Sequence, residues 1–256
     1  MEPERPGVVR TVPETKAQAA ARLAQHVAGV ARLRRAAYAD QAGKGAMMTL
    51  KGWQSARLAR TYPDLLASPR YRDAALFFLN DLYGPKDFSQ RDADIERILP
   101  KLIALLPGSA LSAIADSVEL DEVSEDLDGA VLRAHTPIET ADQISEASYA
   151  AAYRAGSSRP LRQRQIELIA HIGHALDHLT HIPMLLTTVK LMRTPARMAG
   201  LVQLQHFLEH GFVTVRDLHG ADEFIDIIST RETAIMERLF AGAANPFSGA
   251  PETAIK

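Results

Sequence analysis

Cysteine is absent from the 256 residues of the sequence. Its absence excludes disulfide frameworks, metal sites with cysteine ligands and thiol nucleophiles. Aromatic residues make up only 6% of the chain, so aliphatic residues must build most of the core. Hydrophobic residues at 46% and charged residues at 23% are ordinary for a soluble globular protein. This composition excludes disorder or a fibre as the main class.

Long apolar runs are also missing. No stretch approaches the ~18 uninterrupted apolar residues that indicate a membrane helix. The nearest one, residues 98–115, contains Lys101 and two prolines. The first ten residues, MEPERPGVVR, lack the basic start and the apolar run of a signal peptide. We therefore expect a cytoplasmic protein that does not contact a membrane.

Strand signals and catalytic motifs are scarce. The alternation typical of strands occurs only around residues 7–12. Phosphate-binding loops, dinucleotide-binding glycine motifs, serine-hydrolase elbows and zinc-protease motifs do not occur. Helix signals are frequent by contrast. A hydroxyl residue that can cap a helix precedes a proline at Ser68-Pro69, Thr136-Pro137 and Thr194-Pro195.

These patterns predict an all-α fold, a single helical-bundle domain of eight or nine helices over residues 13–241. The expected helices cover residues 14–40, 52–67, 69–83, 88–106, 108–134, 137–155, 160–193, 195–219 and 222–241. A loop is expected at Gly43–Gly45, and kinks or breaks are expected at Pro100 and Pro183. A subdomain break, if there is one, falls near residues 156–158. Residues 1–12 are expected to form a flexible arm, and residues 242–256 a flexible tail.

Charge is unevenly distributed along the chain. Residues 1–60 hold 11 basic and 4 acidic residues, whereas residues 61–150 hold 7 and 17. The balance is therefore +7 in the first segment and −10 in the second. We predict that the basic first helix packs near the acidic middle of the chain, through charge pairs that lie mostly at the surface. A nucleic-acid partner is not expected, because the compensating charge is in the same chain.

Aromatic residues are concentrated in residues 74–88, which include Phe77, Phe78 and Tyr83. They could line a pocket for an apolar ligand, or they could form a core helix followed by a turn. The segment FFLNDLYGPKDF resembles an uncharacterised family of all-helical bacterial proteins with an FFLxxLYGPxDF signature. The stretch from Arg193 to Glu209 fits the same family. The resemblance covers about residues 70–240 and implies no activity, ligand or catalytic residue.

Histidines are the one chemical feature above background, with four of nine inside residues 171–181. His174 with His178, and His206 with His210, have the one-turn spacing that allows two imidazoles to bind one metal ion. A hairpin through Thr194 would bring the two pairs level. The site would then take a transition metal or haem, and Asp177 or Glu209 would orient the ligands. The alternatives are a solvated histidine face or a polar contact between helices, without a site, and a pH-sensitive interface.

The sequence therefore favours binding or regulation as the function. We expect a helical protein, a homo-oligomer, that holds a protein partner or a small apolar ligand and needs no cofactor. The alternative is a metal- or haem-dependent oxidoreductase that uses the histidine hairpin.

Overall fold

The protein is all-α. The structure, a computed structural model, describes residues 14–82, 84, 88–135, 138 and 140–248, and these contain twelve α-helices and no strand. The elements are α1 (Lys16–Ala37), α2 (Gln41–Thr61), α3 (Pro63–Ala67), α4 (Arg72–Phe77), the π-helix η1 (Phe78–Leu82), α5 (Ser89–Leu105), α6 (Gly108–Ala134), the 3₁₀ turn η2 (Ala141–Gln143), α7 (Glu146–Gly156), α8 (Arg159–Thr180), α9 (Leu185–Leu191), α10 (Arg193–Met198), α11 (Val202–Asp217) and α12 (Asp222–Ala241).

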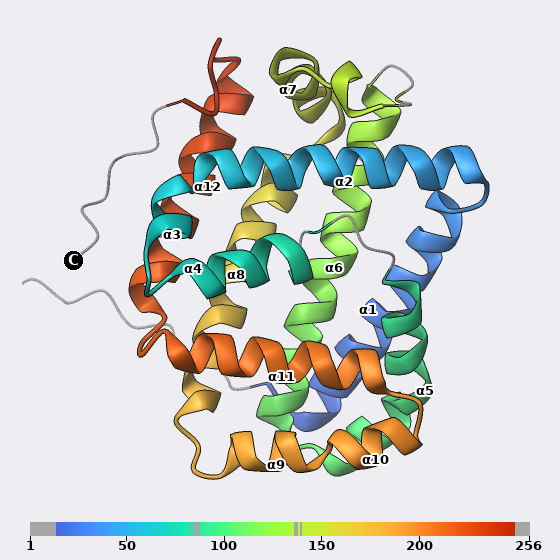
Figure 1. The fold of residues 1–256 in the computed structure, drawn as a ribbon. Helices are drawn as coiled ribbons and strands as arrows, with labels where there is room; N and C mark the ends of the chain where they lie inside the picture. Colours follow the sequence, from blue (N-terminus) through green and yellow to red (C-terminus); the bar gives the residue numbers. More distant parts are fainter. Residues whose placement is uncertain (1–13, 83, 85–87, 136–137, 139, 249–256) are drawn as a thin grey trace, which may run out of the picture.

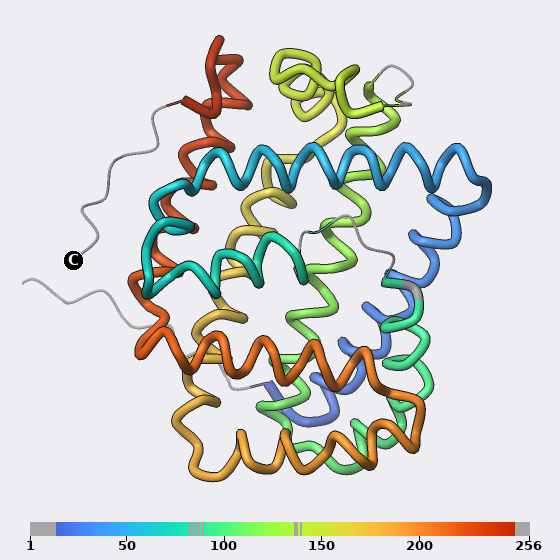
Figure 2. The backbone as a smooth tube through the Cα atoms, in the orientation of Figure 1, coloured from blue at the N-terminus to red at the C-terminus, as the bar shows by residue number. Residues whose placement is uncertain are grey.

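The long helices cross one another (Figure 1). Helices α6, α8 and α12 run roughly up and down the view, and α2 and α11 run across it. The short helices α9 and α10 follow one another along the lower edge. Figure 2 traces the chain from α8 through this edge and back into α11. Helices α9 and α10 therefore lie at one end of the molecule.

Helix α2 begins eleven residues before the predicted start at residue 52 and includes the expected loop at Gly43–Gly45. The side chain of Asp40 accepts a hydrogen bond from the backbone N–H of Gly43 at 2.7 Å and so caps the helix. A helix with a capped start tolerates Gly43 and Gly45 in its first turns, although each glycine costs about 1 kcal/mol relative to alanine inside a helix. The prediction of a loop was wrong for this reason.

Two of the three hydroxyl–proline signals do not cap helices. Helix α4 begins at Arg72, after a turn in which the backbone carbonyl of Ser68 accepts hydrogen bonds. Helix α10 begins at Arg193, so Thr194 and Pro195 lie inside its first turn. The third signal, at residues 136–137, lies outside the described residues, and the helix expected there begins only at Glu146, capped by Ser145. A hydroxyl residue before a proline therefore marks the start of a helix only where the residues before it are not themselves helical or in a turn.

The predicted count of eight or nine helices was too low. The helix expected over residues 160–193 is broken near Pro183, because α8 ends at Thr180 and α9 begins at Leu185. The helix expected over 195–219 is divided into α10 and α11 at Gly200, which has a φ of 70°. Pro100, by contrast, is accommodated inside α5. Helices α6 and α12 have the predicted bounds.

The basic first helix packs along the acidic helix α6, as the charge distribution predicted. Arg22 pairs with Asp116 at 2.6 Å and with Glu119 at 3.1 Å, near the start of α6. Further along, Arg34 pairs with Asp121 at 2.7 Å and with Glu125 at 3.0 Å. The cations of α1 thus compensate acids of the same fold.

The expectation that these pairs lie mostly at the surface was wrong at one end of the helix pair. The side chains of Arg34 and Glu125 are only 4% and 1% exposed. Lys51 of α2 also pairs with Glu125. Burial alone would lower the pKa of Arg34, but the carboxylates of Asp121 and Glu125 outweigh it and raise the pKa. These charges form a buried cluster at the junction of α1, α2 and α6.

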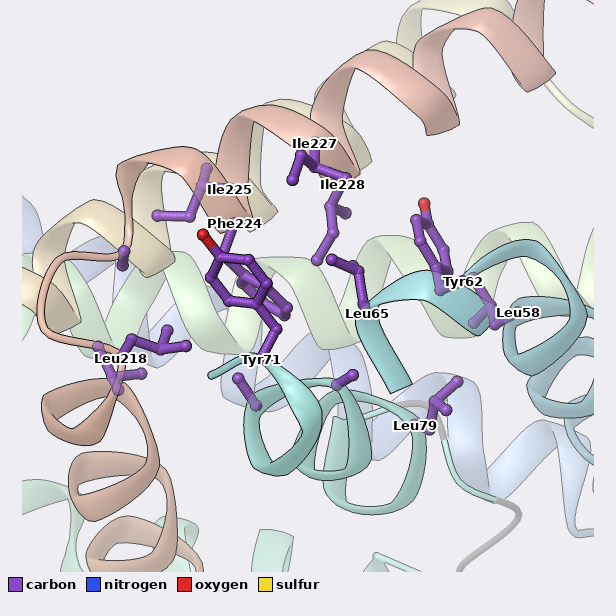
Figure 3. Packing of buried hydrophobic residues seen from close by; sticks show 14 residues of the cluster. Leu58, Tyr62, Leu65, Tyr71, Leu79, Leu218, Phe224, Ile225, Ile227 and Ile228 are labelled. Atoms are coloured by element: carbon purple, nitrogen blue, oxygen red, sulfur yellow. The ribbon is translucent and has the colours of Figure 1, made fainter. Parts of the chain in front are cut away.

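Buried apolar side chains pack in three clusters. One joins α1 to α6 through Leu23, Val27 and Leu111. A second surrounds Trp53 and Tyr149, whose rings stack with centroids 4.4 Å apart. The third joins α3 and α4 to α12 (Figure 3), and its buried members include Leu58, Leu65, Tyr71, Phe224, Ile227 and Ile228. All three clusters are built mainly from aliphatic residues, as the composition required.

Candidate functional site

Two of the four histidines predicted to bind metal pair with different carboxylates. In α8, Nδ1 of His174 lies 3.1 Å from Oδ1 of Asp222, at the start of α12. In α11, Nδ1 of His210 lies 3.2 Å from Oδ2 of Asp81 in η1. His178 and His206 are exposed. The two pairs therefore have separate surroundings.

The hairpin on which the metal prediction depended does not form. Helices α9 and α10 intervene between α8 and α11, so the chain does not turn directly at Thr194. Glu209, a predicted orienting residue, instead pairs with Arg193, and Asp177 accepts a hydrogen bond from the N–H of Ala221. Within the described part of the chain, no group of three or more histidine, aspartate or glutamate side chains could hold a metal ion.

Two of the three aromatic residues predicted to line an apolar ligand pocket, Phe77 and Phe78, have different surroundings. Phe77 is buried and stacks on Phe207, with ring centroids 5.7 Å apart. A methyl group added at Gly211 would lie 2.8 Å from Phe77, so the ring packs directly against the backbone of α11. Phe78 faces a different space, described below, and Tyr83 lies outside the described residues. Phe77 is thus a core residue.

Phe78 lines a cavity of about 70 Å³, whose other lining residues come from α2, α6, α7, α8 and α12. Much of its lining is polar, and includes Gln54, Arg57, Asp128, Arg162 and Glu232. It has room for about two to five water molecules, whereas sites for drug-sized ligands measure roughly 300–1,000 Å³. Such a cavity suits ordered water better than an apolar ligand or a haem group.

The charged groups of this cavity are balanced within the fold. Arg57 forms a two-point ion pair with Glu232, at 2.8 and 3.3 Å. Oδ1 of Asp128 accepts a hydrogen bond from Gln54 at 2.8 Å. Burial raises the pKa of Asp128, and nearby Lys51 opposes the rise. Buried carboxylates with raised pKa values occur at active sites but also in structural networks, and here every named group already has a partner.

A different feature is found at the end of the molecule formed by α9, α10 and the start of α11. Ten large hydrophobic side chains of the described residues are exposed, and seven of them fall within residues 182–208. They are Ile182, Met184, Leu191, Met192, Met198, Val202 and Leu208. We call these seven residues the apolar face. The sequence did not indicate this feature, because apolar residues in helices are expected to be buried.

Helices α9 and α10 contribute little to the core. Helix α9 has no buried residue, and α10 buries only Ala196. Leu191 is 72% exposed and Met198 is 85% exposed. Exposed apolar side chains gathered in one segment of a protein can mark a site of interaction. One polar contact joins α9 to α11: the side chain of Gln205 donates a hydrogen bond to the carbonyl of Val189 at 2.6 Å.

Basic residues accompany the apolar face. The sequence contains no aspartate or glutamate from residue 178 to residue 208, but it contains Lys190, Arg193 and Arg197. Arg193 pairs with Glu209. Among the described residues, Lys190 and Arg197 have no acidic partner within 4.0 Å, and both are exposed. The segment that carries the apolar face thus has two exposed cations, Lys190 and Arg197, without an ion pair within 4.0 Å among the described residues.

No helix among the described residues has the length and apolar character needed to cross a membrane. No curated protein and no solved structure matches the chain. A family model described as a domain of unknown function (DUF8198) matches residues 33–246, which include the whole of α2 to α12 and the apolar face. The chain therefore belongs to this uncharacterised family, the domain of unknown function DUF8198.

Proposed function

We propose that the protein is a helical binding module that docks a protein partner through the apolar face. The observation that carries the proposal is the concentration of seven of the ten exposed large hydrophobic side chains in residues 182–208. Burying such side chains against a partner stabilises a complex by roughly 25 cal/mol per Å² of apolar surface removed from water, before the costs of association. The interior cavity, at about 70 Å³, is too small for a drug-sized ligand, and this supports binding at the surface of the protein.

The partner that fits this surface is an acidic amphipathic helix. Its aliphatic side would cover residues such as Leu191 and Met198, and its carboxylates would approach Lys190 and Arg197. Amphipathic helices bind to apolar surfaces through residues spaced one turn apart. Complementary charge at the border raises the association rate and selects the partner. Exposed methionines suit this role because their flexible side chains adapt to different surfaces.

Two other occupants fit less well. In a symmetric dimer formed through this face, the same patch would meet itself, so Lys190 and Arg197 would lie near identical cations. An anionic membrane is usually bound through clusters of about four to eight basic residues, and often with exposed aromatic residues. The segment has three basic residues and none of its exposed large hydrophobics is aromatic. A homo-oligomer formed through another surface is compatible with the proposal.

The test is a binding titration of the full chain with a synthetic amphipathic peptide that has leucine on one side and glutamate on the other. We expect micromolar affinity, and a loss of at least about tenfold in the double variant Leu191→Ser, Met198→Ser, which removes two exposed apolar contacts. The matched control is Leu161→Ser, a half-exposed leucine on α8 outside the face. The control should bind as the parent does.

Charge is tested separately by the double variant Lys190→Glu, Arg197→Glu. It should weaken binding of the acidic peptide and strengthen binding of a peptide with lysine in place of glutamate. Sedimentation of the chain alone and with phosphatidylglycerol vesicles completes the experiment. Equal binding of both peptides by the parent would contradict the proposal. So would a dimer or vesicle binding that the Leu191→Ser, Met198→Ser variant abolishes.

A further inference from the structure

The sulfur atoms of the chain are unevenly exposed. Cysteine is absent, so the seven methionines hold all the sulfur of the chain. Six of them lie in the described residues. Met47 and Met236 are 1% and 3% exposed, whereas Met184 and Met198 are 76% and 85% exposed. Met192, at 48%, is the third exposed one, and Met48 is intermediate. All three exposed methionines belong to the apolar face.

We propose that Met184, Met192 and Met198 form a reversible oxidation site that changes the apolar face from apolar to polar. The proposal concerns the same surface as the proposed function and deepens it by adding a means of regulation. Methionine sulfoxide is polar, whereas the thioether is apolar and flexible. Oxidation at three of the seven residues of the face would therefore remove much of its attraction for an aliphatic partner.

The chemistry requires a hydroperoxide as oxidant. A lone pair of the thioether sulfur attacks the peroxide oxygen that bears a proton, an S–O bond forms, the O–O bond breaks, and that proton passes to the leaving oxygen. The sulfur is oxidised to the sulfoxide, and the peroxide is reduced to water or an alcohol. Thiol-dependent methionine sulfoxide reductases reverse the step: two thiols become a disulfide, and the sulfoxide oxygen leaves as water.

Position makes the site selective. Susceptibility to oxidation follows exposure, so the buried Met47 and Met236 are sheltered by the packing around them. No thiol in this chain competes for the oxidant, because the sequence has no cysteine. The oxidised side chains lie on helices that bury almost nothing, so oxidation should not unfold the protein.

The first test needs no partner. The full chain is treated with hydrogen peroxide, and oxidation at each methionine is followed by peptide mass mapping. Met184 and Met198 should gain one oxygen atom roughly tenfold faster than Met47 and Met236. The oxidised protein should elute earlier from a hydrophobic-interaction column with an unchanged circular dichroism spectrum. Methionine sulfoxide reductases should restore the original elution.

The control is the triple variant Met184→Leu, Met192→Leu, Met198→Leu, which keeps the face apolar but removes its thioethers. Its elution should not respond to peroxide. Uniform oxidation of all the methionines, or oxidation of the three without a change in elution, would overturn the proposal. The acidic peptide is then titrated against both proteins. If neither reduced protein binds it, the proposed function fails, while the column result still decides whether the oxidation site exists.

Discussion

Helices α1 and α9 both combine aliphatic and basic residues, but they have opposite surroundings. Helix α1 buries Leu23, Val27 and Val30, and its arginines pair with the acids of α6. Helix α9 buries no residue, and Lys190 has no acidic partner within 4.0 Å among the described residues. The difference is that α1 has an acidic amphipathic neighbour in its own chain. The contact between α1 and α6 therefore shows within this molecule the kind of partner that would complete α9 and α10.

The largest expected effect, and the strongest test of the contrast between α1 and α9, concerns the buried charge cluster of α1, α2 and α6. Replacing Glu125 by leucine would leave Arg34 and Lys51 buried without their shared carboxylate. We expect a loss of about 3–5 kcal/mol in the free energy of unfolding, because a buried charge loses its partner. Urea denaturation measures the loss.

Glu96→Gln is the matched control for that experiment, because Glu96 is exposed on α5. Its effect should stay within about 0.5 kcal/mol. A loss below about 1 kcal/mol for Glu125→Leu would mean that the cluster opens to water, and that α1 and α9 differ less than the structure indicates.

A pair of identical substitutions sharpens the comparison directly. Leu23→Ala removes a fully buried side chain between α1 and α6 and should cost about 2–5 kcal/mol. Leu191→Ala removes a side chain that is 72% exposed and should cost less than about 0.5 kcal/mol. Both are measured by thermal and urea unfolding of the protein without a partner. Equal losses would show that α9 packs against something in solution, such as a second copy.

The charge on Asp128 provides a smaller, pH-dependent test of the interior. Since its pKa is raised by burial in the folded protein, the folded state binds this proton more tightly than the unfolded chain does. Its contribution to stability therefore falls as the pH rises from the ordinary aspartate pKa of about 3.9 through the raised value. Asp128→Asn should be more stable than the parent at pH 7, by on the order of 1 kcal/mol.

That advantage should disappear below about pH 4, where Asp128 is protonated in both states. Asparagine keeps an oxygen that can accept the hydrogen bond from Gln54. The control is Asp126→Asn on the same helix, a partly exposed residue. An advantage that persists unchanged in acid would show that the side-chain shape, and not the charge, causes the effect.

The smallest expected effect lies at the start of α9. Met184 has a φ of 65°, a left-handed conformation that asparagine tolerates better than methionine. Met184→Asn should stabilise α9 locally by less than about 1 kcal/mol. Hydrogen exchange should show slower exchange at the first amides of α9 and no change in α1. Faster exchange in α9 would mean that contacts of the Met184 side chain stabilise the start of the helix.

Much of the fold could be predicted from local sequence, but the surroundings of each helix could not. The bounds of α6 and α12 were correct because their starts and ends are local features. Gly43 was misread because the cap at Asp40 outweighs its low helix propensity. The apolar face escaped prediction because Leu191 has the same pattern as a core residue. Only the packing of the other helices shows that nothing in the described chain covers it.

The stacking of Trp53 on Tyr149 has a practical consequence. Trp53 is the only tryptophan, it is 8% exposed, and Phe247 packs beside it with ring centroids 6.1 Å apart. Its emission should be that of an indole shielded from water, and should shift to the red when α2, α7 and the segment around Phe247 separate. The apolar face contains no tryptophan. The fluorescence of Trp53 thus reports on the interior of the protein and should not change when a partner binds at α9 and α10. A single fluorescence measurement can therefore distinguish unfolding from docking.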